Sequence, residues 1–328
     1  MNIRILYFDR LKLFAIYLVI LGYYLFYIHS GLLSSLTYQI IYTFHMPLFI
    51  IISGYFSQNF KTPFLLFSKR KTQSLLLPVL TWTLIITLYS LCTDRPEKRI
   101  VAELIGNSWF LKVLFVSQMA FWFLLKTPFS DGILCAVSVL ISFLLPLGTT
   151  FQFNFMFSFF WVGYFLRKRD SQLDRNNQKI LITSGLVFFS ILVIMLYNQW
   201  DFTNLVMSYD TWNNSLYLII AKYLAGLSGS LFFISLFKKF SKESHKQNFL
   251  SDWGRYTLGI YVMQTLIIQY VFEDLYRHFF KYFAGNNIIV NYCLTLVISA
   301  LTCMLCVFLI KKTSKNKWMN IVLYGGQY

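Results

Sequence analysis

One histidine stands inside an apolar stretch that is long enough to cross a membrane. His45 lies in the segment YTFHMPLFIIISGYF, and Pro47 shortly after it frees a backbone carbonyl and can kink a helix. Imidazole has a pKa near neutrality, so it is the usual general base for activating a hydroxyl group. A purely structural histidine, hydrogen bonded to a neighbouring helix, is the alternative interpretation.

The preceding apolar stretch carries a lysine and a tyrosine on one helical face. Lys12 and Tyr23 are eleven residues apart, and eleven steps of about 100° return close to the starting direction. Tyr23 then lies about 16 Å beyond Lys12, at a depth similar to that of His45 in its own helix. The spacing predicts that Tyr23 and His45 can meet, with Lys12 at the mouth of a cavity or acting as an interfacial anchor.

Other basic residues indicate where an anionic ligand could bind. Lys69, Arg70 and Lys71 form a run that either signals membrane topology or cradles a polyphosphate delivered from the cytoplasm. Lys222 falls within a later apolar stretch, too deep to reach the interface easily, so it is expected to line a cavity or to pair.

The chain lacks the patterns of several enzyme and transporter classes. It has no glycine-rich nucleotide-binding pattern, no GxSxG, no HExxH and no pair of carboxylates within an apolar stretch. Proton- or sodium-coupled transport is disfavoured because it usually needs carboxylates inside the membrane. The five cysteines are odd in number and lie in or beside apolar stretches, so we predict neither a disulfide framework nor a metal site.

The elements that position these residues are predicted to be membrane-spanning helices. The 328 residues are 57% hydrophobic and only 13% charged, whereas charged residues make up about a quarter of soluble domains. A span needs about 20 mostly apolar residues. The runs that satisfy this rule are 13–29, 38–56, 74–92, 109–125, 131–149, 153–167, 180–197, 214–237, 256–272 and 288–310. The sequence therefore predicts an all-α bundle of about ten transmembrane helices, in a single domain over residues 1–328.

The net charge of +16 is explained by topology. With a cytoplasmic N-terminus, most Lys and Arg residues fall on the inside, and an even number of spans places the C-terminus there too. The outer loops then hold only these basic residues: Arg95, Lys98, Arg99, Arg277 and Lys281. Because the basic residues form short clusters rather than a continuous face, we expect the lipid bilayer as a partner and no nucleic acid.

The first two runs together resemble a known family. RILYFDRLKLFAIYLVILGYYLF followed by FHMPLFIIISGYF is similar to the opening motifs of the acyltransferase-3 family, in its branch of fucose 4-O-acetylase-like sugar and polysaccharide O-acetyltransferases. The matching residues are Arg4, Asp9, Lys12, Gly22, the stretch 44–49, Ser53, Gly54 and Tyr55. KRKTQSLLLPVLTW, SWFLKVLF, GYFLRKR and GRYTLGIYVMQT continue the resemblance in the same order along the chain.

This resemblance implies an acetyl-CoA-dependent O-acetyltransferase. In such proteins an acyl group, usually acetyl from cytoplasmic acetyl-CoA, passes to a hydroxyl of a sugar or of a cell-surface or exported polysaccharide. His45 would be the base, Tyr23 would orient the acceptor or the acyl carbonyl, and Lys12 with Arg70 would hold the CoA phosphates. Supporting and cavity-lining roles are implied for Asp9, Lys69, Lys71, Trp109, Lys222 and Gln264, and no metal is implied.

Two positions depart from the family pattern. The Gly-His that ends the first motif is Gly22–Tyr23, and the late Ile-Tyr-x-x-His ends in Gln264. Tyrosine has a pKa near 10 and glutamine does not titrate, so neither replaces a neutral imidazole. Either His45 acts as the base with help from Tyr23, or the chain is a non-catalytic glycan export or assembly subunit on the same scaffold.

The resemblance also implies a location and partners. A multi-pass protein of the bacterial inner (plasma) membrane would meet acetyl-CoA and a glycan acceptor, and a second copy of the chain is a possible further partner. Trp200, Tyr209 and Trp212 near the outer rim are predicted to form an interfacial aromatic belt, with stacking on sugar rings as the alternative.

Overall fold

The computed structural model describes the chain as a bundle of helices. The described residues are 5–28, 32–57, 62–93, 108–144, 152–203, 205, 209–243, 249–272 and 288–328. Every regular element among them is helical, as the sequence predicts. A helix satisfies its own backbone hydrogen bonds, which an apolar environment requires.

The described residues form helical elements along the whole length of the chain. In chain order they are α1 (Leu6–Ile28), α2 (Leu32–Tyr55), α3 (Phe64–Lys71), η1 (Thr72–Leu76), α4 (Leu77–Cys92), α6 (Trp109–Leu124), α7 (Asp131–Leu144), α9 (Phe153–Lys168), α10 (Asp170–Tyr197), α11 (Tyr209–Glu243), α12 (Phe249–Trp253), η2 (Gly254–Tyr256), α13 (Thr257–Leu266), η3 (Ile267–Phe272), α16 (Ile288–Thr313) and α17 (Lys317–Tyr324). The elements η1 and η3 are π-helical, and η2 is a 3₁₀ turn.

Several of the helices are long and apolar enough to cross a membrane. Among the described residues these stretches are Leu36–Tyr55, Phe64–Cys92, Asp170–Tyr197, Ser215–Phe240 and Ile289–Thr313. Two shorter apolar helices, α6 and α7, fall on further predicted runs. The runs 13–29, 153–167 and 256–272 form α1, α9 and α13 with η3, which are not among these five stretches. The protein is therefore a multi-pass membrane protein, and the count of ten spans stays a prediction.

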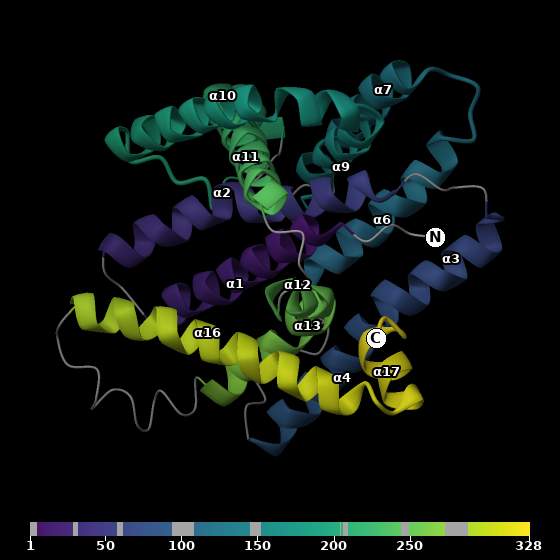
Figure 1. The fold of residues 1–328 in the computed structure, drawn as a ribbon, viewed down its shortest axis with the longest axis vertical. Helices are drawn as coiled ribbons and strands as arrows, with labels where there is room; N and C mark the ends of the chain where they lie inside the picture. The colour runs from purple at the N-terminus through teal and green to yellow at the C-terminus, as the bar shows by residue number, and fades with distance from the viewer. Residues whose placement is uncertain are drawn as a thin grey trace.

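The two N-terminal helices lie at the centre of the bundle. Figure 1 shows α1 and α2 side by side, with α10 and α11 on one side of them and α16 on the opposite side. Helix α13 packs against α1, α4 and α16. The residues of the first two predicted spans are thus surrounded by the rest of the protein.

Helices α2 and α9 approach each other closely through two glycines. A Cβ atom on Gly54 would overlap the carbonyl oxygen of Phe160, and one on Gly163 would overlap the carbonyl oxygen of Ile51. Small residues at a helix crossing allow this backbone contact, which is a common way to pack helices inside a membrane. The crossing fixes the half of α2 that follows His45.

The beginning of α1 and the end of the chain lie at the same end of α13. The backbone of Asp9 packs against Gly254, just before α13 begins, and Tyr324 of α17 contacts the position of Gly259 one turn into it. The two ends of the described chain are therefore neighbours.

A network of charged side chains ties five helices together at this same end. Lys238 of α11 lies 3.3 Å from Asp170 and 2.9 Å from Asp174, and Arg167 of α9 donates a hydrogen bond to the Tyr55 hydroxyl at 3.0 Å. Burial raises the pKa of the nearby Tyr7 phenol, and the negative charge of Asp170 acts in the same direction. The gathering of basic residues at this end agrees with the charge pattern of the sequence.

Candidate active site

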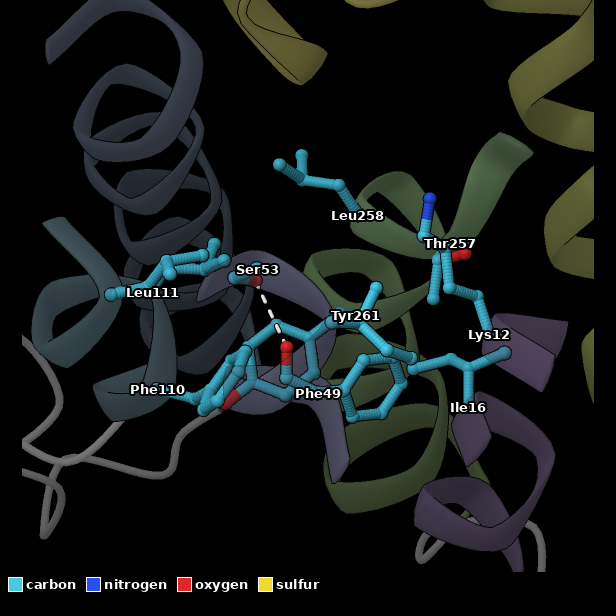
Figure 2. A pocket seen from close by; sticks show the side chains of 11 residues that line it. Lys12, Ile16, Phe49, Ser53, Phe110, Leu111, Thr257, Leu258 and Tyr261 are labelled. Atoms are coloured by element: carbon cyan, nitrogen blue, oxygen red, sulfur yellow. Dashed lines mark hydrogen bonds between the residues drawn. The ribbon is translucent and has the colours of Figure 1, made fainter. Parts of the chain in front are cut away.

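A cavity opens between α1, α2, α6 and α13. Its volume is about 120 Å³. Figure 2 shows Lys12 and Ile16 of α1 on one side, Phe110 and Leu111 of α6 on the other, and Phe49 and Tyr261 between them. Most of the lining is apolar. Lys12 at one end gives the mouth of the cavity a positive charge.

Lys12 is held at the mouth by its own helix. Its Nζ lies 3.6 Å from Asp9 Oδ1, one turn earlier, and 5.1 Å from the centroid of the Phe56 ring. Asp9 is buried, and its backbone packs against Gly254, so the carboxylate is fixed where α1 meets η2. Within the residues described, Asp9 is placed to position Lys12.

Two further polar groups, from α2 and α13, line the cavity. Ser53 Oγ donates a hydrogen bond to the Phe49 carbonyl oxygen at 2.9 Å, shown as the dashed line in Figure 2, on the side of the cavity where Leu111 lies. Thr257, at the first position of α13, lies beside Lys12 on the other side. The polar lining is thus divided between the two sides of the cavity.

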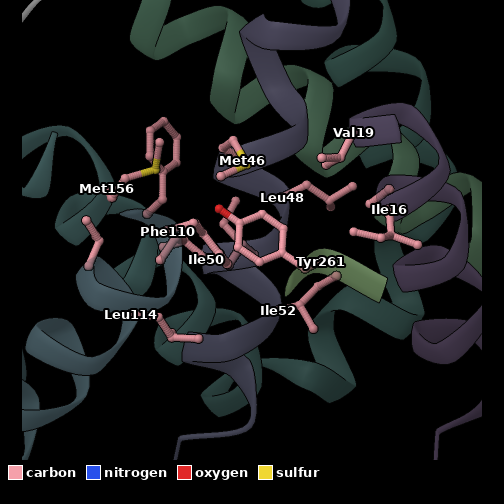
Figure 3. Close-up of a cluster of buried hydrophobic side chains, with 14 of the residues drawn as sticks. Ile16, Val19, Met46, Leu48, Ile50, Ile52, Phe110, Leu114, Met156 and Tyr261 are labelled. Carbon is pink, nitrogen blue, oxygen red and sulfur yellow. The ribbon is translucent and has the colours of Figure 1, made fainter. Parts of the chain in front are cut away.

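Tyr261 joins the cavity to the buried core. Its ring stands among buried side chains of α1 and α2, including Val19, Met46 and Leu48, as Figure 3 shows. Its hydroxyl is hydrogen bonded to the backbone of Phe110, in the first turn of α6. The first N–H groups of a helix have no acceptor within it, so the Phe110 N–H is available to donate to this hydroxyl oxygen.

His45 lies in α2 one turn before the cavity-lining Phe49 and is 1% exposed. Its Nδ1 is 2.7 Å from the carbonyl oxygen of Ile41, and its ring meets the Tyr42 ring edge to face, with centroids 4.7 Å apart. A carbonyl oxygen can only accept, so Nδ1 carries the proton of the neutral ring. The lone pair is therefore on Nε2, which is the atom able to receive a proton.

A third aromatic residue, Tyr42, lies between the Tyr23 region of α1 and His45. Tyr42 packs against Gly22, where a Cβ atom would lie 2.9 Å from its ring, and it also contacts His45. Tyr23 is an electrostatic neighbour of both Tyr42 and Tyr261. A direct meeting of Tyr23 and His45 stays a prediction.

Sequence reasoning did not identify Tyr42, although a signal for it was present. Tyr42 precedes His45 by three residues and so shares its helical face. It lies opposite the glycine of the first motif, and only a residue without a side chain leaves room for its ring. Gly22, the residue before Tyr23, therefore marks the position on α1 against which the Tyr42 ring packs.

Gln264 is fully buried one turn beyond Tyr261. Neither its Oε1 nor its Nε2 has a hydrogen-bond partner in the part of the chain that the structure describes. An unpartnered buried amide costs about 1–3 kcal/mol, which points to a water or ligand group that supplies the missing bonds. Gln264 is not among the residues that line the cavity, so its expected cavity-lining role stays a prediction.

The remaining predicted site residues lie outside the cavity lining. Lys69 and Arg70 are exposed in the last turn of α3, and Lys71 extends over the Phe67 ring at 5.7 Å. Trp109 is half-buried at the start of α6, and its neighbour Phe110 lines the cavity in its place.

Lys222 is buried at 4% exposure, but it also lies away from this cavity. Its Nζ donates a hydrogen bond to the Leu205 carbonyl at 2.9 Å and sits 5.0 Å from the centroid of the Phe155 ring. These contacts fasten the stretch before α11 to the helix bundle. Trp200 contacts the Tyr217 ring on the same side.

Some predicted features fall outside the described residues. These are Arg4, the basic residues 95, 98, 99, 277 and 281, and the side chains of Tyr209 and Trp212. Among the described residues no group of three or more His, Cys, Asp or Glu side chains could hold a metal ion. All five cysteines are free thiols, and Cys303 and Cys306 pack in the core.

Comparison with known proteins gives a match over nearly the whole chain. Residues 5–310 match the family model of an acyltransferase domain. The chain is 27% identical over 236 residues to Nodulation protein NolL of Sinorhizobium fredii, covering 64% of this chain and 62% of that protein. It is 34% identical over 179 residues to Nodulation protein NolL of Mesorhizobium japonicum, covering 50% of this chain and 48% of that one. The matched regions thus span about half to three-fifths of these relatives. No solved structure matches the chain.

Proposed function

The chain belongs to the acyltransferase-3 family, and we propose that it is a membrane O-acetyltransferase that moves an acetyl group from cytoplasmic acetyl-CoA to a hydroxyl of a sugar or of a cell-surface or exported polysaccharide. The observation that carries this proposal is the cavity itself. It has a lysine at its mouth, an apolar body, and a neutral histidine one helical turn beyond its lining.

The shape and charge of the cavity suit an acyl-CoA donor. The nucleotide end of CoA carries several phosphates, and lysine binds phosphate through charge-assisted hydrogen bonds. Lys12 meets these phosphates first, and Arg70 with Lys69 and Lys71 adds positive charge nearby on α3. The slender thioester arm then lies along Ile16, Phe49 and Tyr261.

The chemistry needs a base and a donor for the developing negative charge. His45 Nε2 takes the proton from the acceptor hydroxyl, and the acceptor oxygen bonds to the thioester carbonyl carbon. The carbon–sulfur bond breaks, and the proton passes to the departing CoA sulfur, which leaves an acetyl ester and free CoA. Tyr23, with its phenol beside this group, orients the acceptor or the carbonyl oxygen.

The same proposal includes the topology of the whole chain. We place ten helices across the bacterial inner membrane, in one domain over residues 1–328, with both termini in the cytoplasm. The charge distribution of the sequence supports this orientation, as does the packing of α17 beside the start of α13, where α1 also begins. Lys12 then faces the compartment that contains acetyl-CoA.

A second candidate function rests on the same scaffold. Tyr23 and Gln264 stand where the family pattern has histidine, which favours a non-catalytic glycan export or assembly subunit. That protein would have no use for a lysine at the mouth of an apolar cavity or for a base with a free lone pair. The presence of both favours the enzyme.

The proposal is tested by a transfer assay. Membranes that contain the protein are given acetyl-CoA with a labelled acetyl group and the glycan fraction of the host, and ester-linked label is measured. We expect incorporation by the intact protein and a loss of about 100- to 10,000-fold in the His45→Ala variant at equal expression, because a positioned base contributes about that much. Turnover retained by His45→Ala would remove the assigned base, and glycan export without label would favour the second candidate.

A further inference from the structure

Helix α4 carries three buried hydroxyl groups on one face. Thr83, Thr87 and Ser90 are spaced i, i+4 and i+7, so they form one stripe about 10 Å long. Their exposed fractions are 5%, 8% and 5%. None of these three residues lines the cavity beside Lys12.

None of these three hydroxyl oxygens has a hydrogen-bond partner in the described part of the protein. The contrast with their own helix is clear, because Thr81 donates to the Leu77 carbonyl and Thr93 donates to the Tyr89 carbonyl, each at 3.0 Å. A hydroxyl in a helix can always turn back to such a carbonyl. The three buried hydroxyls that do not bond to their own helix therefore need hydrogen-bond partners from water or from a ligand.

The stripe runs from the level of the cavity to the far end of α4. Trp82 donates a hydrogen bond to the Leu323 carbonyl, and the next residue, Tyr324, contacts the position of Gly259. Thr83 therefore lies at the depth of the α13 turn that carries Tyr261. Ser90 lies two residues before the end of α4, at the membrane face opposite to Lys12.

The surroundings of the stripe select for neutral ligands that carry hydroxyl groups. The buried face of α4 holds no charged side chain, and α13 packs along it. Beside Ser90, the Tyr89 ring meets Tyr270 edge to face, with centroids 6.1 Å apart. Tyr270 belongs to the π-helical segment η3, and such segments occur frequently at functional sites. Hydroxyls and aromatic rings together are the groups that bind sugars, whereas an ion would find no counter-charge.

We propose that Thr83, Thr87 and Ser90 line a polar passage along which a hydroxyl-bearing acceptor reaches the level of Tyr261 from the membrane face opposite to Lys12. The identity of the acceptor as a substrate rests on the proposed acetyltransferase function. Donor and acceptor then enter from opposite faces and meet between α1, α2 and α13.

The passage is tested by thiol labelling, which needs no enzymatic turnover. In a chain whose five native cysteines are replaced, Thr87→Cys is compared with Leu88→Cys. Leu88 lies at the same depth but points outward, with 53% of its surface exposed to the surroundings of the bundle. We expect a membrane-impermeant methanethiosulfonate added at the face opposite to Lys12 to modify Thr87→Cys at least tenfold faster than Leu88→Cys. Equal rates, or labelling of Thr87→Cys only from the Lys12 face, would overturn the proposal.

A functional test separates this passage from the proposed enzyme activity. The double variant Thr83→Val, Thr87→Val removes two hydroxyls and preserves the side-chain shape, and Thr81→Val is the matched control because the Thr81 hydroxyl is already bonded to its own helix. We expect the double variant to raise the KM for the acceptor at least tenfold, with acetyl-CoA binding unchanged, and the control to behave as the parent. An unchanged KM would contradict the passage. If the parent protein transfers no acetyl group, the proposed function fails, and the labelling result alone decides the passage.

Discussion

The hydrogen bond from His45 Nδ1 to the Ile41 carbonyl determines what the histidine can do. Since Nδ1 holds the proton of the neutral ring, the ring presents Nε2 as an acceptor. A structural histidine would use both nitrogens to bind neighbouring helices. Using one nitrogen on its own helix leaves the other for chemistry.

Gln264 offers a residue-scale prediction in which stability and function change in opposite directions. Replacing it with methionine removes two unpartnered polar atoms at similar volume, so the ligand-free protein should gain about 1–3 kcal/mol and its thermal midpoint in detergent should rise. Acetyl transfer should fall, because the amide no longer binds the substrate or its water. Both values are measured on one preparation.

One outcome would contradict the prediction for Gln264. A lower thermal midpoint for Gln264→Met would mean that the amide has partners within the fold. The control is Gln118→Met on α6, whose Oε1 is also buried and without a hydrogen-bond partner among the described residues but which lies on a different helix from Tyr261 and Gln264. That change should raise stability without lowering transfer.

The individual site residues were predictable to different degrees. His45 and Lys12 stand out in the sequence because ionisable side chains in or beside apolar runs are costly and few, and Tyr23 is singled out only by its spacing from Lys12. Tyr42 shares the helical face of His45 in the sequence, but only the structure shows that it packs against Gly22. Lys222 has the same sequence signal as His45 but binds the Leu205 carbonyl instead, since the nearest polar group is decided by the fold.

At the scale of the helices, the α2–α9 crossing holds the part of α2 that carries the cavity-lining residues. Gly163→Ala would place a methyl group on the Ile51 carbonyl and force the two backbones apart. We expect a loss of about 3 kcal/mol or more and a lower thermal midpoint, since overpacking at a backbone contact has no flexible side chain that can move away. Thermal unfolding in detergent, followed by fluorescence or size exclusion, measures the change.

Gly132 provides the matched control for that prediction. A Cβ atom there meets nothing within 4 Å, so Gly132→Ala in the first turn of α7 should leave stability unchanged or raise it slightly. Equal midpoints for the two alanine variants would show that the α2–α9 contact is looser than described.

The long apolar helices were predictable from hydropathy alone. The runs 38–56, 74–92, 180–197, 214–237 and 288–310 each coincide with a helix long enough to span a membrane. The division of 256–272 into α13 and a π-helical end was not predictable, because π-helical turns depend on local packing rather than on composition. The stripe on α4 also escaped notice, since threonine and serine in an apolar run usually bond to their own helix.

At the scale of the whole molecule, the proximity of α17 to the start of α1 leads to a topology prediction. A fluorescent protein fused after Tyr328 should mature in the cytoplasm, and alkaline phosphatase fused at the same point should be inactive. Phosphatase fused after Asn198 should be active, because ten spans place that turn outside. An active phosphatase after Tyr328 would mean an odd number of spans or the reverse orientation.

The charge distribution of the sequence gives a prediction of the orientation, but it gives none of how the helices pack. The sequence orders the basic segments along the chain, and the structure brings Lys238, Arg167 and Tyr55 into one network that no spacing rule anticipates. Contacts between residues this far apart in sequence depend on which helix faces pack together. One sequence without its relatives does not reveal that choice.

Calorimetric titration of acetyl-CoA into the detergent-purified protein tests the central claim most directly. The account predicts micromolar binding that weakens at least tenfold in Lys12→Ala and is unchanged in Lys126→Ala, whose side chain lies over the Trp122 ring outside the cavity. Absence of binding by a folded sample, or equal binding by Lys12→Ala, would contradict the assignment of this cavity to the acyl donor.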